Sequence, residues 1–262
     1  MTSVQTSYGF AHTDDGAEIS WRAFGAGSPL LLIAGQRCTH KAWLQVVPSL
    51  SVNHRVIVYD ARGFGTSSPG QIGGITTQSL ASDACAVLDS ARERSAAVYG
   101  HSMGGRIAQW VSINHPERVE RLVLAGTSGG NNLVPRDRAA ISPIMRSTDI
   151  MNVKSAIFFS EEFRKQHRDV VLDFFDGRST PEIQRAHFLA SVSHDAWDEL
   201  HRITVPTLVV HGDQDVVTLP ENARQLTARI PGSRLHLEPG GLHCVHLEYS
   251  VVQEVIADFL NG

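Results

Sequence analysis

The chain is poor in cysteine, and its three cysteines, Cys38, Cys85 and Cys244, lie far apart in the sequence. An odd and scattered set predicts neither a disulfide framework nor a zinc site. No apolar run approaches the ~18 residues of a membrane span. Residues 1–10 have neither a basic n-region nor an apolar h-region, so no secretory signal is expected. A reducing cytoplasm is the predicted location.

The sequence also lacks an excess of positive charge. It has 23 Lys and Arg against 27 Asp and Glu, a net charge of -4, and no basic stripe. Nucleic acids and anionic membranes attract basic surfaces, so neither is an expected partner. The expected partner is a small-molecule substrate. The oligomeric state stays open between a monomer and a homodimer.

What the chain does have is a regular alternation of short apolar runs and helical patterns. Its 262 residues, 42% of them hydrophobic, suit one large core. The expected strands are 19–24, 29–34, 55–59, 96–99, 121–124, 207–211 and 234–237, and the expected helices include 78–92, 106–115 and 251–260. Alternating strands and helices predict an α/β fold, with a mainly parallel central sheet that carries helices on both faces.

One segment, from Asn131 to Arg202, breaks this alternation. It is helical in pattern and rich in Met and Phe. We interpret 131–202 as an inserted helical cap, with residues 1–130 and 203–262 forming the core domain. Met and Phe suit apolar ligands, so Met145, Met151, Phe158 and Phe159 are candidates for substrate binding. The alternative is that these side chains only pack a small core of the cap.

The most informative motif is Gly-x-Ser-x-Gly at residues 100–104. It lies between the apolar run 96–99 and the helical pattern that begins at Arg106. A serine at such a junction takes a strained turn, and the flanking glycines let strand and helix approach closely. The turn exposes the Ser102 hydroxyl beside the free N–H groups of a helix start. Ser102 is therefore the predicted nucleophile.

A serine nucleophile needs a base, and the base needs an orienting acid. In this fold the acid and then the histidine follow the serine along the chain. Asp215 lies four residues past the strand 207–211 and is favoured over Asp213, which is expected to cap a turn. The loop after the strand that ends at Leu124 offers no carboxylate as an alternative.

The base candidates lie in the loop that follows the last predicted strand. His243 comes directly after Gly240 and Gly241 and is favoured over His246. The developing oxyanion also needs donors. The Met103 N–H, just after the nucleophile, is one predicted donor, and the Gln36 N–H, in the loop after strand 29–34, is the other.

Together these motifs resemble the α/β-hydrolase superfamily over nearly the whole chain. Residues 100–105 match its nucleophile elbow, 60–67 its Asp-x-Arg-Gly-x-Gly-x-Ser turn, 212–220 its acid loop, and His243 with Glu248 its histidine loop. The branch that looks nearest holds small cytoplasmic esterases, enol-lactone hydrolases and carbon–carbon bond hydrolases. One departure is Ala34-Gly35, where the family usually has His-Gly before the oxyanion donor.

The resemblance implies a serine hydrolase with a Ser102–His243–Asp215 triad and no cofactor or metal. The predicted reaction is cleavage of an ester, lactone or thioester-like bond in a small, largely apolar substrate through an acyl-enzyme. Two alternatives stay open. One is a carbon–carbon bond hydrolase or cofactor-free perhydrolase in the same fold, and the other is a non-catalytic, receptor-like binding protein.

Overall fold

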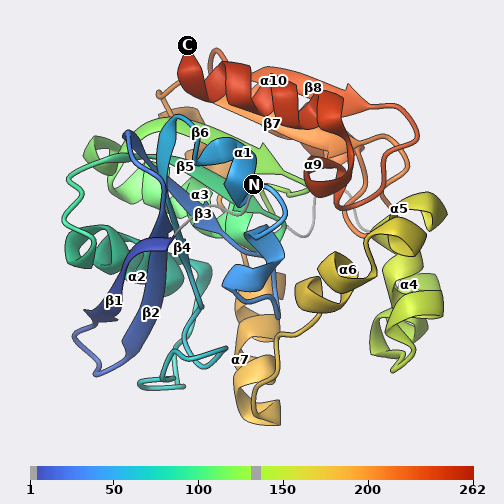
Figure 1. Ribbon diagram of the computed structural model, residues 1–262, viewed down its shortest axis with the longest axis horizontal. Coiled ribbons are helices and arrows are strands. Elements are labelled where there is room, and N and C mark those ends of the chain that lie inside the picture. The colour runs from blue at the N-terminus through green and yellow to red at the C-terminus, as the bar shows by residue number, and fades with distance from the viewer. Residues whose placement is uncertain (1–4, 131–136) are drawn as a thin grey trace.

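A single eight-stranded sheet organises the molecule (Figure 1). The computed structural model describes residues 5–130 and 137–262. The strand order is β1-β2-β4-β3-β5-β6-β7-β8. The pairs β1/β2 and β2/β4 are antiparallel, and all later pairs in this order are parallel. The strands are β1 (Gln5–His12), β2 (Glu18–Phe24), β3 (Ser28–Ile33), β4 (His54–Tyr59), β5 (Ala96–His101), β6 (Val119–Ala125), β7 (Thr207–Gly212) and β8 (Arg234–Glu238).

The central strands are buried on both faces, and alternate residues face opposite layers. In β3, Leu31 and Ile33 pack into one apolar cluster, whereas Leu30 and Leu32 pack into the other. Each of these side chains is almost fully buried. The uninterrupted apolar runs therefore reflect a sheet that is covered on both sides.

Helices supply the two covering layers. The first layer is formed by α2 (Thr77–Ser90), α3 (Met103–Asn114) and α8 (Glu221–Arg229), whose apolar residues join the Leu31 cluster. The second layer is formed by η1 (His40–Trp43), α1 (Val47–Leu50), α9 (Val245–Glu248) and α10 (Ser250–Asn261), which join the Leu30 cluster. A short 3-10 turn, η2 (Pro116–Arg118), links α3 to β6. The predicted α/β architecture is confirmed.

The described part of the segment between β6 and β7 is helical and lies at the right and at the bottom centre of Figure 1. Its elements are α4 (Arg138–Arg146), η3 (Ile150–Lys154), η4 (Ser155–Ile157), α5 (Glu161–Gln166), α6 (Arg168–Phe174), α7 (Pro181–Val192) and η5 (Trp197–Arg202). The first six residues of the predicted cap, 131–136, lie outside the described residues. The cap boundaries stay a prediction.

Several phenylalanines of this segment join the apolar core beside the sheet. Phe158, Phe159, Phe163 and Phe174 belong to the same buried cluster as Leu30 of the central sheet. These phenylalanines therefore pack against the helical layer that contains η1, and α6 contacts η1.

Strand β1 and helix α8 have no counterpart among the predicted elements, and neither do the short elements η1, α1, η2 and α9. Strand β1 forms an edge of the sheet and leaves Tyr8 and Phe10 exposed, so its sequence lacks a buried apolar run. Helix α8 buries only Asn222, Ala223 and Leu226, too few apolar residues for a clear pattern. Within the described residues, no helix is both long and apolar enough to span a membrane.

Candidate active site

Ser102 occupies the turn between β5 and α3, and its backbone has φ 55° and ψ -118°. A positive φ is unfavourable for a residue with a side chain, and such strain gathers at functional sites. The surrounding chain holds the turn in place. The Ser102 N–H donates to the Ala125 carbonyl at 2.9 Å, and the Thr127 hydroxyl donates to the Ser102 carbonyl at 2.7 Å.

Gly104 brings the start of α3 against the end of β3. A Cβ at this position would lie 2.0 Å from the Ile33 carbonyl oxygen, so only glycine permits the approach. The loop that continues from Ile33 contains Gln36. Met103 is the first residue of α3, where a backbone N–H has no acceptor within the helix. The two predicted oxyanion donors therefore belong to segments that meet at Gly104.

Asp215 is buried in the loop after β7, and its carboxylate accepts several hydrogen bonds. Oδ1 accepts from the backbone N–H groups of Val217 at 2.8 Å and Thr218 at 2.9 Å. Oδ2 lies 2.7 Å from Nδ1 of His243 and 3.1 Å from Nε2 of His211. These contacts hold the carboxylate in one orientation.

Burial alone would raise the pKa of Asp215, because it disfavours the charged form. The neighbouring His243 and His211 oppose this effect, and together they leave the pKa well below its usual value. Asp215 is therefore an anion at neutral pH, although its side chain is inaccessible to water.

His243 follows the turn after β8 and connects this carboxylate with the pocket. Its Nδ1 faces Asp215, which leaves Nε2 for another partner. Its carbonyl oxygen lies 3.2 Å from Nε2 of His101, and the ring of Phe158 packs edge-on against its imidazole. Within the described residues, Ser102 Oγ makes no hydrogen bond to His243. Such bonds are often long before a substrate is bound.

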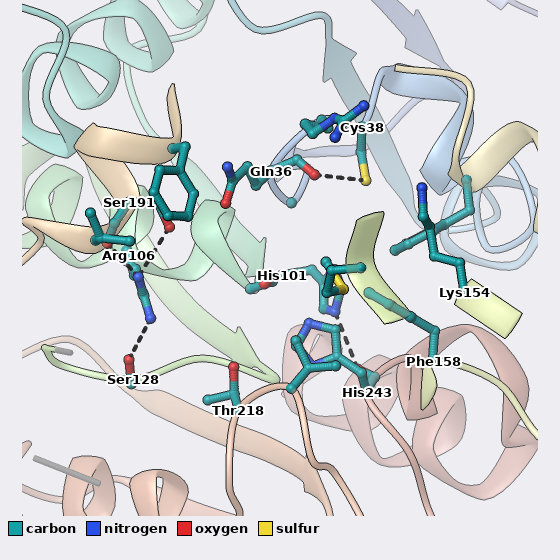
Figure 2. A pocket seen from close by; sticks show the side chains of 18 of the residues that line it. Gln36, Cys38, His101, Arg106, Ser128, Lys154, Phe158, Ser191, Thr218 and His243 are labelled. Carbon is teal, nitrogen blue, oxygen red and sulfur yellow. Dashed lines mark hydrogen bonds between the residues drawn. The ribbon is translucent and has the colours of Figure 1, made fainter. Parts of the chain in front are cut away.

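Ser102 and His243 line the same cavity, which has a volume of about 380 Å³. Gln36, Met145, Phe158 and Phe174 also face it, and Figure 2 shows Phe158 beside His243. The lining combines apolar rings with a few polar groups, as expected for a small-molecule site. Within the described residues, no group of three or more His, Cys, Asp or Glu is placed to hold a metal ion.

Residues 28–249 match the family model of the alpha/beta hydrolase fold. The chain is an α/β-hydrolase. It is 29% identical to 3-oxoadipate enol-lactonase 2 of Acinetobacter baylyi, over 84% of each chain. It is also 29% identical to 2-hydroxymuconate semialdehyde hydrolase of a Pseudomonas species, over 90% of this chain and 88% of that one.

A solved structure gives the same result for the fold. A hydrolase from Pseudomonas aeruginosa superposes with a TM-score of 0.84 at 30% identity, covering 98% of this chain and 99% of that one. The similarity extends through the segment between β6 and β7, so the relationship includes the whole architecture and not only the central sheet.

The pocket of this hydrolase corrects part of the substrate-binding prediction. Met145 and Phe158 line the cavity, whereas Met151 and Phe159 are not among its lining residues. Phe159 is fully buried and stacks on Phe163. Met151 packs against the adjoining apolar cluster. Three further aromatic side chains of the same segment face the cavity in their place: Phe174, Phe175 and Phe188.

The rejected alternatives to the acid and the base have structural roles in the hydrolase. Asp213 accepts a hydrogen bond from the Gly240 N–H at 2.8 Å, which is the turn-capping role predicted for it. His246 does not line the cavity. It is buried against Trp43, Tyr99 and His101.

Two contributors to the site were missed by sequence reasoning. His211 supports the Asp215 carboxylate, and its Nε2 also lies 2.7 Å from the Thr218 carbonyl, so Nε2 carries the hydrogen. Arg106 of α3 donates to the carbonyl and hydroxyl of Ser191 in α7 and to the hydroxyl of Ser128 (Figure 2). Arg106 thereby ties the inserted segment to the core. In the sequence, His211 is the last residue of the predicted strand 207–211, and nothing in that pattern indicates that its side chain contacts Asp215.

The buried His246 predicts a pH dependence of stability. Burial, and to a smaller extent the charge of His243, lowers its pKa to about 3. Below about pH 6.5, the unfolded chain therefore binds a proton at His246 that the folded chain does not, and stability is lost as the pH falls. Between pH 6 and pH 4, the plot of unfolding free energy against pH should be shallower for His246→Phe than for the wild type, by about 1.4 kcal/mol per pH unit.

Chemical denaturation at several pH values measures these slopes. Trp43→Phe alters the same contact without removing a titrating group, so it should lower the curve without changing its slope. Parallel curves for His246→Phe and the wild type would contradict the lowered pKa of His246 in the folded chain.

Proposed function

We propose that this hydrolase cleaves an ester, lactone or thioester-like bond of a small, largely apolar substrate through an acyl-enzyme. Ser102 is the nucleophile, His243 the general base and acid, and Asp215 the residue that orients His243. The N–H groups of Met103 and Gln36 bind the oxyanion.

One observation carries this proposal. Ser102, whose backbone φ is positive, lines the same cavity as His243. Nδ1 of His243 lies 2.7 Å from the buried carboxylate of Asp215. A serine, an imidazole and an acid in this order are the parts of a nucleophilic relay. The similarity to an enol-lactonase supports chemistry at an acyl carbon.

The proposed reaction has two stages. Ser102 Oγ attacks the carbonyl carbon while His243 Nε2 takes the hydroxyl proton. The oxyanion that forms accepts hydrogen bonds from Met103 and Gln36. The intermediate collapses as His243 gives its proton to the leaving oxygen or sulfur. Water, deprotonated by His243, then attacks the acyl-enzyme and releases the acid and Ser102.

Asp215 stabilises the transient imidazolium of His243. Since its carboxylate is already ionised and held by four donors, it needs no reorganisation when the positive charge forms. His101 and His246 lie next to His243, and burial lowers the pKa of both, so these two rings stay neutral during the reaction.

A second candidate is hydrolysis of a carbon–carbon bond beside a ketone, which would use the same serine and histidine. The similarity to 2-hydroxymuconate semialdehyde hydrolase favours testing it. Product analysis with matched ester, lactone and diketone substrates separates the two reactions. Formation of a carboxylic acid and a ketone from a diketone, with no turnover of esters, would replace the proposed reaction.

A fluorophosphonate probe tests the nucleophile directly. We expect one phosphonyl group to attach to Ser102 Oγ with loss of fluoride, and mass spectrometry of the peptide that contains Ser102 should locate it. Ser95→Ala, which changes a serine that bonds Glu120 at the surface, should label as fast as the wild type. No labelling of the folded protein would favour a receptor-like binding protein over an enzyme.

A further inference from the structure

The charges around the cavity are strongly one-sided. Arg37, Arg106, Arg146 and Lys154 line it, whereas no Asp or Glu does so among the described residues. The whole chain has more acidic than basic residues, 27 against 23, so this bias is local to the pocket. A cavity with one sign of charge concentrates ligands of the opposite sign.

Two of these cations, Arg37 and Lys154, come from separate segments. Arg37 follows the Gln36 loop, and Lys154 ends η3 of the inserted segment. Neither forms an ion pair with another described residue. The nearby Lys41, by contrast, pairs with both Asp173 and Asp176.

Arg37 and Lys154 also repel each other. Burial and the charge of Arg37 both lower the pKa of Lys154. Two like charges without a carboxylate between them favour the binding of an anion at this side of the cavity.

The backbone presents Arg37 to the cavity in a costly conformation. Its φ is 62°, in the region that favours glycine. Gly177 packs so closely on it that a Cβ there would lie 1.7 Å from the Arg37 carbonyl oxygen. An arginine held in this way is consistent with a role for its side chain at the pocket.

Lys154 lies at the apolar side of the cavity. Figure 2 shows it beside Phe158, with His101 and His243 between it and Arg106. Arg106 is held on the opposite side by Ser128 and Ser191. A substrate bound at Ser102 with its chain along Phe158 would thus end near Lys154.

We propose that the substrate carries a carboxylate at the end of its apolar arm, and that Arg37 and Lys154 bind it while Ser102 attacks the acyl carbon. The substrate class is then an ester or lactone that bears a free acid group. This inference rests on the proposed function. It narrows the substrate from largely apolar to apolar with one anionic end.

A matched pair of substrates tests the proposal. One is the mono-p-nitrophenyl ester of a seven-carbon dicarboxylic acid, and the other is the same ester with the free acid replaced by a carboxamide of equal size. We expect kcat/KM to be higher for the acid, and Lys154→Met to lower the acid-to-amide ratio by roughly 10- to 100-fold, the loss expected for one charge-assisted hydrogen bond.

Three further variants sharpen the result. Arg37→Gln should also lower the ratio, and Lys154→Arg should preserve most of it. Lys165→Met removes the same charge from α5 outside the cavity, where Lys165 pairs with Glu161, and should leave the ratio unchanged. Equal kcat/KM for acid and amide, or a ratio that Lys154→Met and Arg37→Gln do not change, would overturn the carboxylate proposal while leaving ester hydrolysis intact.

If the proposed hydrolase function itself is wrong, the experiments give a different result. In that case neither ester is hydrolysed and the fluorophosphonate probe does not react. Calorimetric measurement of heptanoate and heptanamide binding to the wild type then tests separately whether Arg37 and Lys154 bind a carboxylate. Tighter binding of heptanoate that disappears in Lys154→Met supports it, and equal or absent binding of the two compounds rejects it.

Discussion

Ser102→Ala is expected to abolish turnover while the fold persists. Without the hydroxyl there is no nucleophile and no acyl-enzyme, and in another serine hydrolase the comparable change lowers kcat by about 10⁶-fold. The turn itself depends on backbone contacts that alanine keeps, namely the Ser102 N–H to the Ala125 carbonyl and the Thr127 hydroxyl to the Ser102 carbonyl. Steady-state hydrolysis of a p-nitrophenyl ester and thermal unfolding of the same sample measure both effects.

Glycine at the same position separates strain from chemistry. Ser102→Gly should be equally inactive, but more stable than Ser102→Ala by about 1 kcal/mol, because glycine tolerates a φ of 55°. Ester hydrolysis retained by both variants at the wild-type rate would exclude Ser102 as the nucleophile. Equal stability of the two variants would show that the turn stores little strain.

Asp215→Asn should have the second largest effect. An amide at this position favours the wrong tautomer of His243 and cannot stabilise its cation, and in another serine-hydrolase triad the same change lowers kcat by roughly 10⁴-fold. The variant keeps the size and shape of the side chain. The fluorophosphonate reaction should slow in parallel with ester hydrolysis, since both need the activated serine.

Asp215→Asn should also change how the free energy of unfolding depends on pH. The pKa of Asp215 lies below its usual value in the folded chain, so the ionised carboxylate stabilises the fold at neutral pH. This contribution is present above the unfolded pKa of about 3.9 and is lost as the pH falls through the folded pKa. The difference in unfolding free energy between wild type and Asp215→Asn should therefore shrink on acidification below pH 4.

Denaturation curves at pH 7 and in the most acidic buffer in which both proteins still fold provide this comparison. Asp213→Asn changes a neighbouring carboxylate that caps the turn at Gly240, and it should leave ester hydrolysis near the wild-type rate. Wild-type activity in Asp215→Asn would remove Asp215 from the relay and direct attention to another acid.

Much of the architecture could be predicted because it depends on local patterns. The runs 29–34 and 96–99 are apolar without interruption, which indicates strands that are buried on both faces, and β3 and β5 are such strands. Edge strand β1 lacks this signal, since one of its sides remains exposed. Helix α3 begins three residues earlier than its apolar pattern, because Met103, Gly104 and Gly105 complete its first turn.

The segment predicted to form a cap shows where such prediction ends. Its Met and Phe content indicated an apolar environment, but Phe159 belongs to the core and Phe188 to the cavity. Short helices and 3-10 turns lack a sustained period, so the pattern does not tell which side of each element faces inward. That direction depends on how α6 and α7 pack on η1 and α3.

The sequence by itself determined the strand-to-helix turn at Ser102 and the residue types around it, because a short chain segment with small residues at fixed spacing has few conformations available. The tertiary structure alone decided which distant side chains meet there. It placed Arg106 against Ser191, and Arg37 and Lys154 at one cavity, since contacts between residues far apart in the chain follow from packing and not from any local pattern.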